Sequence, residues 1–209
     1  MATNYDELIK EVEIWGHRDD LSTLIPSFIQ FAEVEMFNNQ VEPLLIRDME
    51  SIQTTTTSTG KYLSLPSGYE STRSIRLILQ SLDGGEVRYQ SPEQMKRYQY
   101  TGKPNFFTIV GNEIEFDRVP DMEYEVEVQI YVKPDPLTED NQTNTVLNNF
   151  PTIYLYGALS QFFIHAQDDT QASKYNELFF NSIRGANKSQ KKGRYGPAPS
   201  MNLDCGMIV

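Results

Sequence analysis

The most constraining feature of the sequence is an apolar stretch near its C-terminal end, residues 150–165, FPTIYLYGALSQFFIH. Hydrophobic side chains would lie all around the helix that this stretch predicts, and a helix without a polar face belongs in the middle of a fold. Pro151 suits the first turn of such a helix, where its missing N–H costs no hydrogen bond. We therefore expect a central helix onto which the earlier parts of the chain fold back.

A second helix is predicted directly after the first. Asp168 and Asp169 interrupt the apolar run, and either of them can cap a new helix. Apolar residues then recur at helical spacing at Ala172, Tyr175, Phe179 and Ile183. Gly185 is a typical C-terminal stop, so the two segments predict a helix hairpin.

The first 46 residues predict two more helices. Asn4 has the cap spacing of a helix start, and the first helix would end at Gly16. The second would open at Pro26, with Glu33 and Glu35 on its solvent side. The residues expected to face inward from this helix are Ile25, Phe28, Ile29, Ala32 and Met36.

Between these helical parts the pattern changes to that of β-strands. Residues 49–58, MESIQTTTTS, are rich in β-branched side chains, and residues 124–132, YEVEVQIYV, alternate strictly. Hairpin turns are predicted at residues 83–85, Asp-Gly-Gly, and at 111–112, Gly-Asn. Residues 91–98 predict a short helix that opens with Ser-Pro-Glu. This region therefore holds about six or seven strands.

The order of helices, strands and helices predicts an α+β fold. Residues 1–46 and 146–185 would form a small helical bundle, residues 47–135 an inserted antiparallel β domain, and residues 136–145 a connection. Residues 186–209 are rich in Gly, Pro and Ser and lack periodicity, which predicts an extended, flexible C-terminal arm.

Charge limits the possible partners. The chain carries a formal net charge of −11, so duplex DNA would repel the folded body. Residues 184–194 are the exception, because they hold five basic residues and no acid. A basic arm on an acidic body suggests docking onto another molecule.

No catalytic, metal or cofactor motif is evident in the sequence. His17 and His165 lack ligand partners at metal spacing, and no glycine-rich phosphate loop occurs. The one cysteine, Cys205, excludes an internal disulfide and fits a reducing compartment. The polar, acidic N-terminus does not look like a signal peptide, and the longest apolar run is too short to span a bilayer. We therefore expect a soluble protein made in the cytoplasm.

Carboxylates form two rows in the β region. Alternation places the members of each row on one face of a strand: Glu113, Glu115 and Asp117 in one row, Glu123, Glu125 and Glu127 in the other. If the two strands pair, one sheet surface becomes crowded with negative charge. Three interpretations remain open: a solvated face, a wall that repels nucleic acid, or a cation site. A hydrolase that uses Glu113 and Glu115 is disfavoured, because nothing supplies a shaped pocket or an acid of raised pKa.

Several segments resemble one family in their order along the chain. They are PSFIQFAEVEMF (26–37), RDMES (47–51) with its threonine-rich strand, YLSLPSGYESTRSI (62–75), YQSPEQMKRY (89–98), GKPNFFTIVGNEIEF (102–116) and residues 149–183. Together they resemble the head-to-tail adaptor proteins of tailed bacteriophages, related to the tail tubular protein A of T7-like phages. No invariant motif carries the resemblance, which rests on the pattern of segments.

The resemblance implies a structural, non-enzymatic virion protein at the head–tail junction. Such adaptors form a dodecameric ring under the portal protein, extend the DNA channel without binding DNA specifically, and present a platform for the tail nozzle or next tail protein. A C-terminal arm would dock on the portal through Lys188, Lys191, Lys192, Arg194, Tyr195, Pro197, Met201, Leu203 and Ile208. The six carboxylates of the two rows become candidates for the channel lining. The alternative is a β-rich tail or base-plate module that recognises carbohydrate through exposed aromatic residues in a groove.

Overall fold

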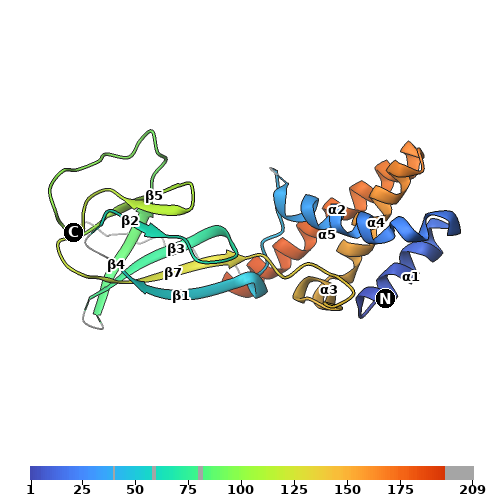
Figure 1. Ribbon diagram of the computed structural model, residues 1–209, viewed down its shortest axis with the longest axis horizontal. Coiled ribbons are helices and arrows are strands. Elements are labelled where there is room, and N and C mark those ends of the chain that lie inside the picture. The colour runs from blue at the N-terminus through green and yellow to red at the C-terminus, as the bar shows by residue number, and fades with distance from the viewer. Residues whose placement is uncertain (40, 58–59, 80–81, 196–209) are drawn as a thin grey trace, which may run out of the picture. The chain divides into compact units, whose positions relative to one another are not determined.

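The computed structural model describes residues 1–39, 41–57, 60–79 and 82–195, which form two compact units (Figure 1). Among the described residues, one unit combines those at positions 1–48 with those at 134–195, and the other comprises those at 49–133. The fold is α+β, as predicted, and it consists of N-terminal helices, a curled sheet and C-terminal helices.

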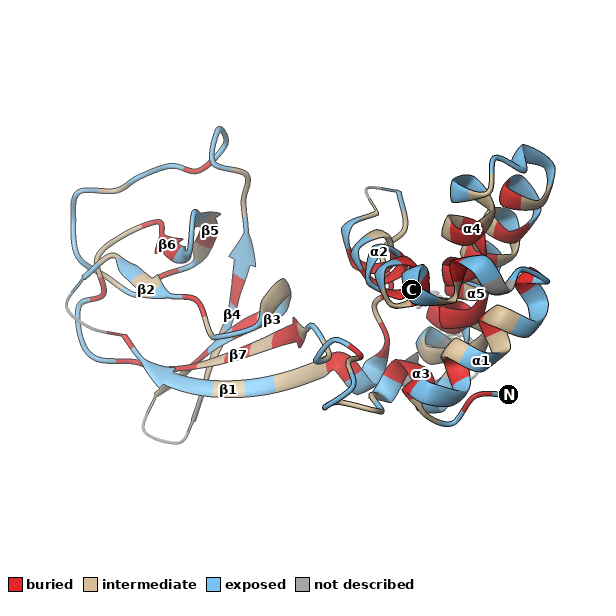
Figure 2. Ribbon diagram, turned by 45° about the vertical axis from the view of Figure 1, so that its right-hand side comes forward, coloured by how far each residue is buried: buried red, intermediate tan, exposed pale blue. Residues whose placement is uncertain are grey.

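The helical unit is built around α4 (Pro151–His165). Along the chain, α4 is preceded by α1 (Tyr5–Gly16), the 3-10 helix η1 (Asp19–Leu24), α2 (Ile25–Asn38) and α3 (Thr145–Asn149), and is followed by α5 (Asp169–Tyr195). Each of the four α-helices packs against α4, which is buried along much of its length (Figure 2). The absence of a polar face on this helix thus predicted its central position correctly.

Local capping signals account for several helix ends. The Asn4 side chain accepts a hydrogen bond from the Glu7 N–H at 2.9 Å, as its spacing predicted. The Asp168 side chain likewise accepts a hydrogen bond from the Gln171 N–H at 3.0 Å, and it caps the start of α5. The five inward-facing residues predicted on α2 are all buried.

Two predictions about this unit are wrong. Glu33, expected in solvent, is buried in the core of the unit. Helix α5 does not end at Gly185, because its buried face continues through Ala186 and the polar residue Asn187. Asn187 accepts a hydrogen bond from Leu45 N–H at 3.0 Å and donates one to the Pro43 carbonyl at 2.9 Å. These contacts hold residues 186–195 in the helix, so this part of the predicted arm is not an extended segment.

The β unit is one mixed sheet with strand order β1-β7-β3-β4-β5-β6-β2. Its strands are β1 (Glu50–Thr56), β2 (Tyr62–Ser64), β3 (Tyr69–Leu79), β4 (Leu82–Tyr89), β5 (Phe106–Val110), β6 (Glu113–Phe116) and β7 (Glu125–Val132), and the 3-10 turn Arg47–Met49 precedes them. One side of the curled sheet encloses a hydrophobic core that includes Ile75, Leu77, Val87, Phe107 and Val128.

We had expected an antiparallel sheet, but one pair of neighbouring strands is parallel. Strands β4 and β5 run parallel, with Arg88 opposite Phe106 and Tyr89 opposite Phe107. Parallel neighbours need a long crossover connection, and residues 90–105 supply it. This connection contains one turn, closed onto the Ser91 carbonyl, in place of the predicted helix.

One hairpin turn was also placed incorrectly. Leu79 pairs with Leu82, so residues 83–85 lie inside β4, whereas the turn at Gly111 is where the sequence predicted it. The register of β3 and β4 shifts between Leu77 and Ile78, and the inserted residue is Gly84. A Cβ atom at Gly84 would lie 2.7 Å from the Leu77 carbonyl oxygen, which explains why glycine is needed there.

Candidate functional site

The two predicted rows of carboxylates do not share a surface. Strand β6 lies between β5 and β2, whereas β7 lies between β1 and β3, so the two strands are not neighbours. Glu115 and Asp117 are also buried, with 2% and 0% of their surfaces exposed. Because a channel wall must be exposed, these two residues do not have the predicted role. Glu113, Glu123 and Glu125 are exposed, and Glu127 is partly buried.

Glu115 instead connects three segments of the β unit. Its carboxylate accepts hydrogen bonds from Arg97 Nε at 2.8 Å, Arg97 Nη2 at 3.1 Å and Lys61 Nζ at 2.9 Å. The Arg97 guanidinium, assisted by the Lys61 ammonium, holds the pKa of the Glu115 carboxyl below its ordinary value despite burial. The ionised carboxylate therefore ties residues 90–105 and the residue directly before β2 to β6.

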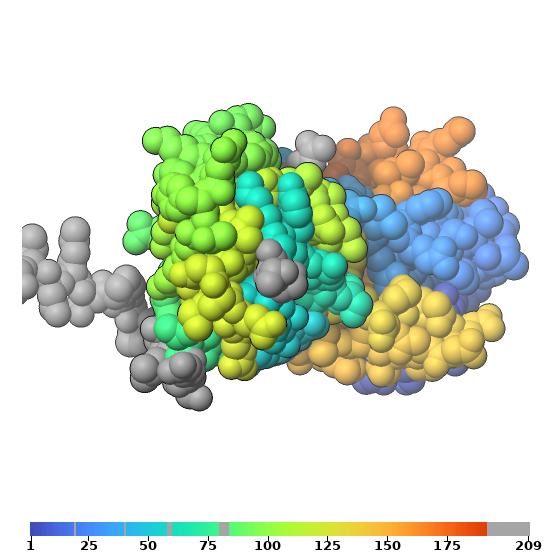
Figure 3. Space-filling view, turned by 60° about the vertical axis from the view of Figure 1, so that its left-hand side comes forward, coloured from blue at the N-terminus to red at the C-terminus, as the bar shows by residue number. Residues whose placement is uncertain are grey.

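Asp117 anchors the same connection at its other end. Its Oδ1 atom accepts the backbone N–H groups of Asn105 at 3.1 Å and Phe106 at 3.4 Å, and its Oδ2 atom pairs with Arg118 at 2.7 and 2.9 Å. The Arg118 guanidinium lies 4.6 Å from the centroid of the Tyr98 ring. Residues 90–105 are thus fixed on β6, and they form a broad part of the surface of this unit, green in Figure 3.

On the outer face of the sheet, charges alternate in sign. Arg76 on β3 lies directly opposite Glu127 on β7 and Glu86 on β4. Cross-strand pairs of opposite charge stabilise a sheet, whereas the crowding of like charges that we had expected would destabilise it. Glu125, another of the predicted acids, is the first residue of β7, and its cross-strand neighbours are Thr56 and Ile78.

The basic segment predicted as an arm begins on the helix surface. Arg184, Lys188 and Lys191 are exposed on α5, and Lys192, Arg194 and Tyr195 belong to the same helix. The predicted anchors Pro197, Met201, Leu203 and Ile208 lie outside the described residues.

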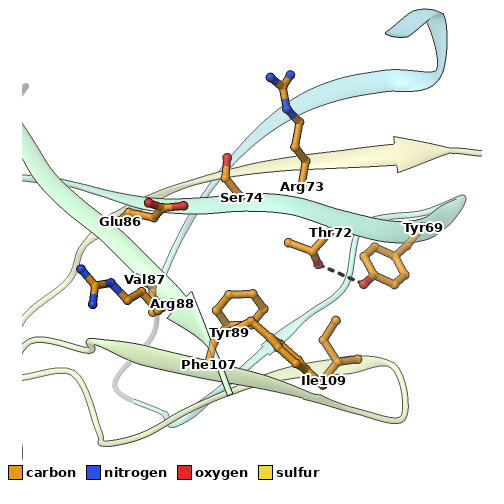
Figure 4. A pocket seen from close by; sticks show the side chains of 10 residues that line it. All are labelled: Tyr69, Thr72, Arg73, Ser74, Glu86, Val87, Arg88, Tyr89, Phe107 and Ile109. Carbon is orange, nitrogen blue, oxygen red and sulfur yellow. Dashed lines mark hydrogen bonds between the residues drawn. The ribbon is translucent and has the colours of Figure 1, made fainter. Parts of the chain in front are cut away.

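A groove of about 500 Å³ opens in the β unit where β4 leaves β3 (Figure 4). Figure 4 shows Tyr89, Phe107 and Ile109 on one side of it and Thr72 and Tyr69 of β3 on the other. The Tyr89 ring packs edge-on against Phe107, with 5.6 Å between the ring centroids, yet 60% of Tyr89 is exposed. No local sequence pattern predicted this groove, because it depends on which strands pair.

Family comparison agrees with this architecture. Residues 3–200 match the model of the SU10 adaptor protein family. The chain belongs to the SU10 adaptor protein family. The match spans both units and implies a structural, non-enzymatic role as a phage head–tail adaptor that contacts other virion proteins. No curated protein matches the chain, and the match does not show the more specific similarity to tail tubular protein A.

Two further findings on this member of the SU10 adaptor family concern membranes and metal ions. None of its described helices is both long and apolar enough to cross a bilayer. The described residues also contain no group of three or more His, Cys, Asp or Glu side chains that could hold a metal ion.

The sequence reasoning also missed a buried carboxylate in the helical unit. Glu33 accepts hydrogen bonds from Leu137 N–H at 2.9 Å and from the Tyr154 hydroxyl at 2.8 Å, and Asn144 donates to that hydroxyl at 2.7 Å. Burial raises the pKa of Glu33, although its two hydrogen bonds partly oppose this effect. The position could have been inferred from helical spacing, because Glu33 lies between Ile29 and Met36 on one face of α2.

Proposed function

We propose that the chain assembles into a ring, with twelve copies as the expected number, beneath the portal protein. The ring extends the DNA channel, and its tail-facing side is the platform for the tail nozzle or next tail protein. This arrangement follows that of the tail tubular protein A of T7-like phages. The observation that carries the proposal is the match to the SU10 adaptor family across residues 3–200.

Exposed apolar side chains on α2 support self-association. Phe31 and Val34, one helical turn apart, are each 57% exposed. Large apolar side chains on one exposed face of a helix are typical of a contact with another protein. A neighbouring copy of the chain would cover them in a ring.

The end of α5 supports docking on the portal. Lys188 and Lys191 project into solvent from a helix that is tied to the unit by Asn187. Their charges would guide α5 and the residues after it to an acidic portal surface, with Tyr195, Pro197, Met201, Leu203 and Ile208 as anchors.

Repulsion of DNA supports a channel role for the exposed acids. The net charge of −11 disfavours tight binding to the DNA that would pass through the ring. Glu123, Glu125 and Glu127 stay candidates for the lining, together with Glu113, and a repulsive wall lets DNA slide.

Electron microscopy of the protein mixed with its portal tests the proposal. We expect added density around one end of the portal, reduced by the variant K188E/K191E and by removal of residues 196–209. The matched control K10E/K174E reverses two exposed lysines elsewhere in the helical unit, and it should dock normally. Absence of added density on an intact portal would refute the adaptor ring. Equal docking by all variants would leave the ring proposal standing. It would refute only the docking role of Lys188, Lys191 and residues 196–209.

A further inference from the structure

The groove of the β unit contains an open strand edge. Strand β4 pairs with β3 only from Ile75 to Leu79, and then leaves it to pair with β5 at Arg88 and Tyr89. Among the described residues, positions 69–74 of β3 therefore have a strand neighbour on the β7 side alone. An open edge presents main-chain N–H and C=O groups that another extended segment can pair with.

Side chains around this edge provide both apolar and charged contacts. Tyr69, Tyr89 and Ile109 offer apolar surface above the buried Phe107, and Arg88 and Glu86 lie beside them. Arg73, at the same edge, is ion-paired with Glu50. An extended segment with apolar residues at alternate positions would place those side chains against the aromatic wall.

We propose that this groove binds one extended segment of another virion protein, added as a strand along residues 69–74 of β3. About six residues would pair with the edge, and their alternate side chains would contact Tyr89 and Ile109. An acidic residue in the segment would pair with Arg88. The inference rests on the proposed adaptor function and specifies how one partner is held.

The shape of the groove favours a single segment over a second folded copy of this chain. β3 bounds it on one side and β5 on the other, as Figure 4 shows. Each described strand of this chain already pairs within its own sheet, so it would bring its neighbours into the groove. A segment that becomes ordered on binding brings no neighbours and needs little space beyond its own width.

A peptide array tests this proposal with the full chain. Overlapping peptides of about twelve residues, each long enough for a typical strand, would tile the other structural proteins of the same phage and residues 184–209 of this chain. We expect a cluster of adjacent peptides from another virion protein to bind. Y89A should weaken this binding on the order of tenfold or more, as for a central aromatic contact. The matched control Y62A removes an exposed tyrosine of β2 outside the groove and should leave binding unchanged.

Two further readouts make the result decisive. N-methylation of alternate backbone nitrogens in the bound peptide removes hydrogen-bond donors and should abolish binding if the peptide adds as a strand. Peptides that bind Y89A and wild type equally, or no binding peptide at all, would overturn the site. Groove-dependent binding of residues 184–209 alone would show that the occupant is the chain itself. A ring on the portal without groove-dependent peptides would leave the proposed function standing and reject this inference.

Discussion

Replacement of Asp117 by alanine tests whether a buried carboxylate holds the connection between β4 and β5. Asp117 is fully buried, and the Arg118 side chain that pairs with it is only 14% exposed. Removing one partner of such a pair leaves the other charge buried and unpaired, which costs about 3–5 kcal/mol. Two backbone N–H groups also lose their acceptor, at about 1 kcal/mol or more each. Contacts of Arg118 with the rings of Tyr98 and Tyr100 persist and offset part of this cost.

We therefore expect D117A to destabilise the β unit by about 3–5 kcal/mol. Urea unfolding followed by circular dichroism measures this loss, and hydrogen exchange should show that residues 90–106 lose protection first. The control is E113A, which removes an exposed carboxylate from β6, the strand that ends just before Asp117, and should change stability by less than about 0.5 kcal/mol. A cost below about 1 kcal/mol for D117A, or equal costs for the two variants, would refute this role for Asp117.

Three further predictions concern the helical unit. Because Glu33 has a raised pKa in the folded state, wild type should lose stability relative to E33Q as the pH rises above the ordinary glutamate value, and urea midpoints at several pH values measure this difference. N187A should cost about 1–3 kcal/mol in urea unfolding, because it leaves a backbone N–H and a carbonyl without partners, and K188A should cost little. G157A should cost about 1–3 kcal/mol, since a Cβ there would lie 2.8 Å from the Ala32 Cβ. In G185A the added Cβ meets no atom within 4 Å, so this variant should raise the melting temperature. A melting temperature higher for G157A than for G185A would contradict the packing around α4.

The sequence by itself determined the features that depend on neighbouring residues. Hydrophobic periodicity predicted the inward face of α2, and the absence of a polar face predicted the central position of α4. Asn4 caps its helix as its spacing predicted, and of the two caps proposed for α5, Asp168 makes the capping hydrogen bond. Strict alternation also located β7 to within one residue of its start. These signals are local, because a helix turn or a strand pleat repeats within a few residues.

The tertiary structure decided what depends on distant pairing. Alternation predicted that Glu115 and Asp117 lie on one face of one strand. In the structure β6 ends just before Asp117, and the return of residues 90–105 over this segment determines that both carboxylates are buried. Glycine is a typical helix stop, but α5 continues beyond Gly185. Its continuation is stabilised by the hydrogen bonds of Asn187 with Pro43 and Leu45. The groove likewise exists only because β4 pairs first with β3 and then, farther along the strand, with β5. Burial and strand partners are set by contacts between distant segments, and no short stretch of sequence encodes them.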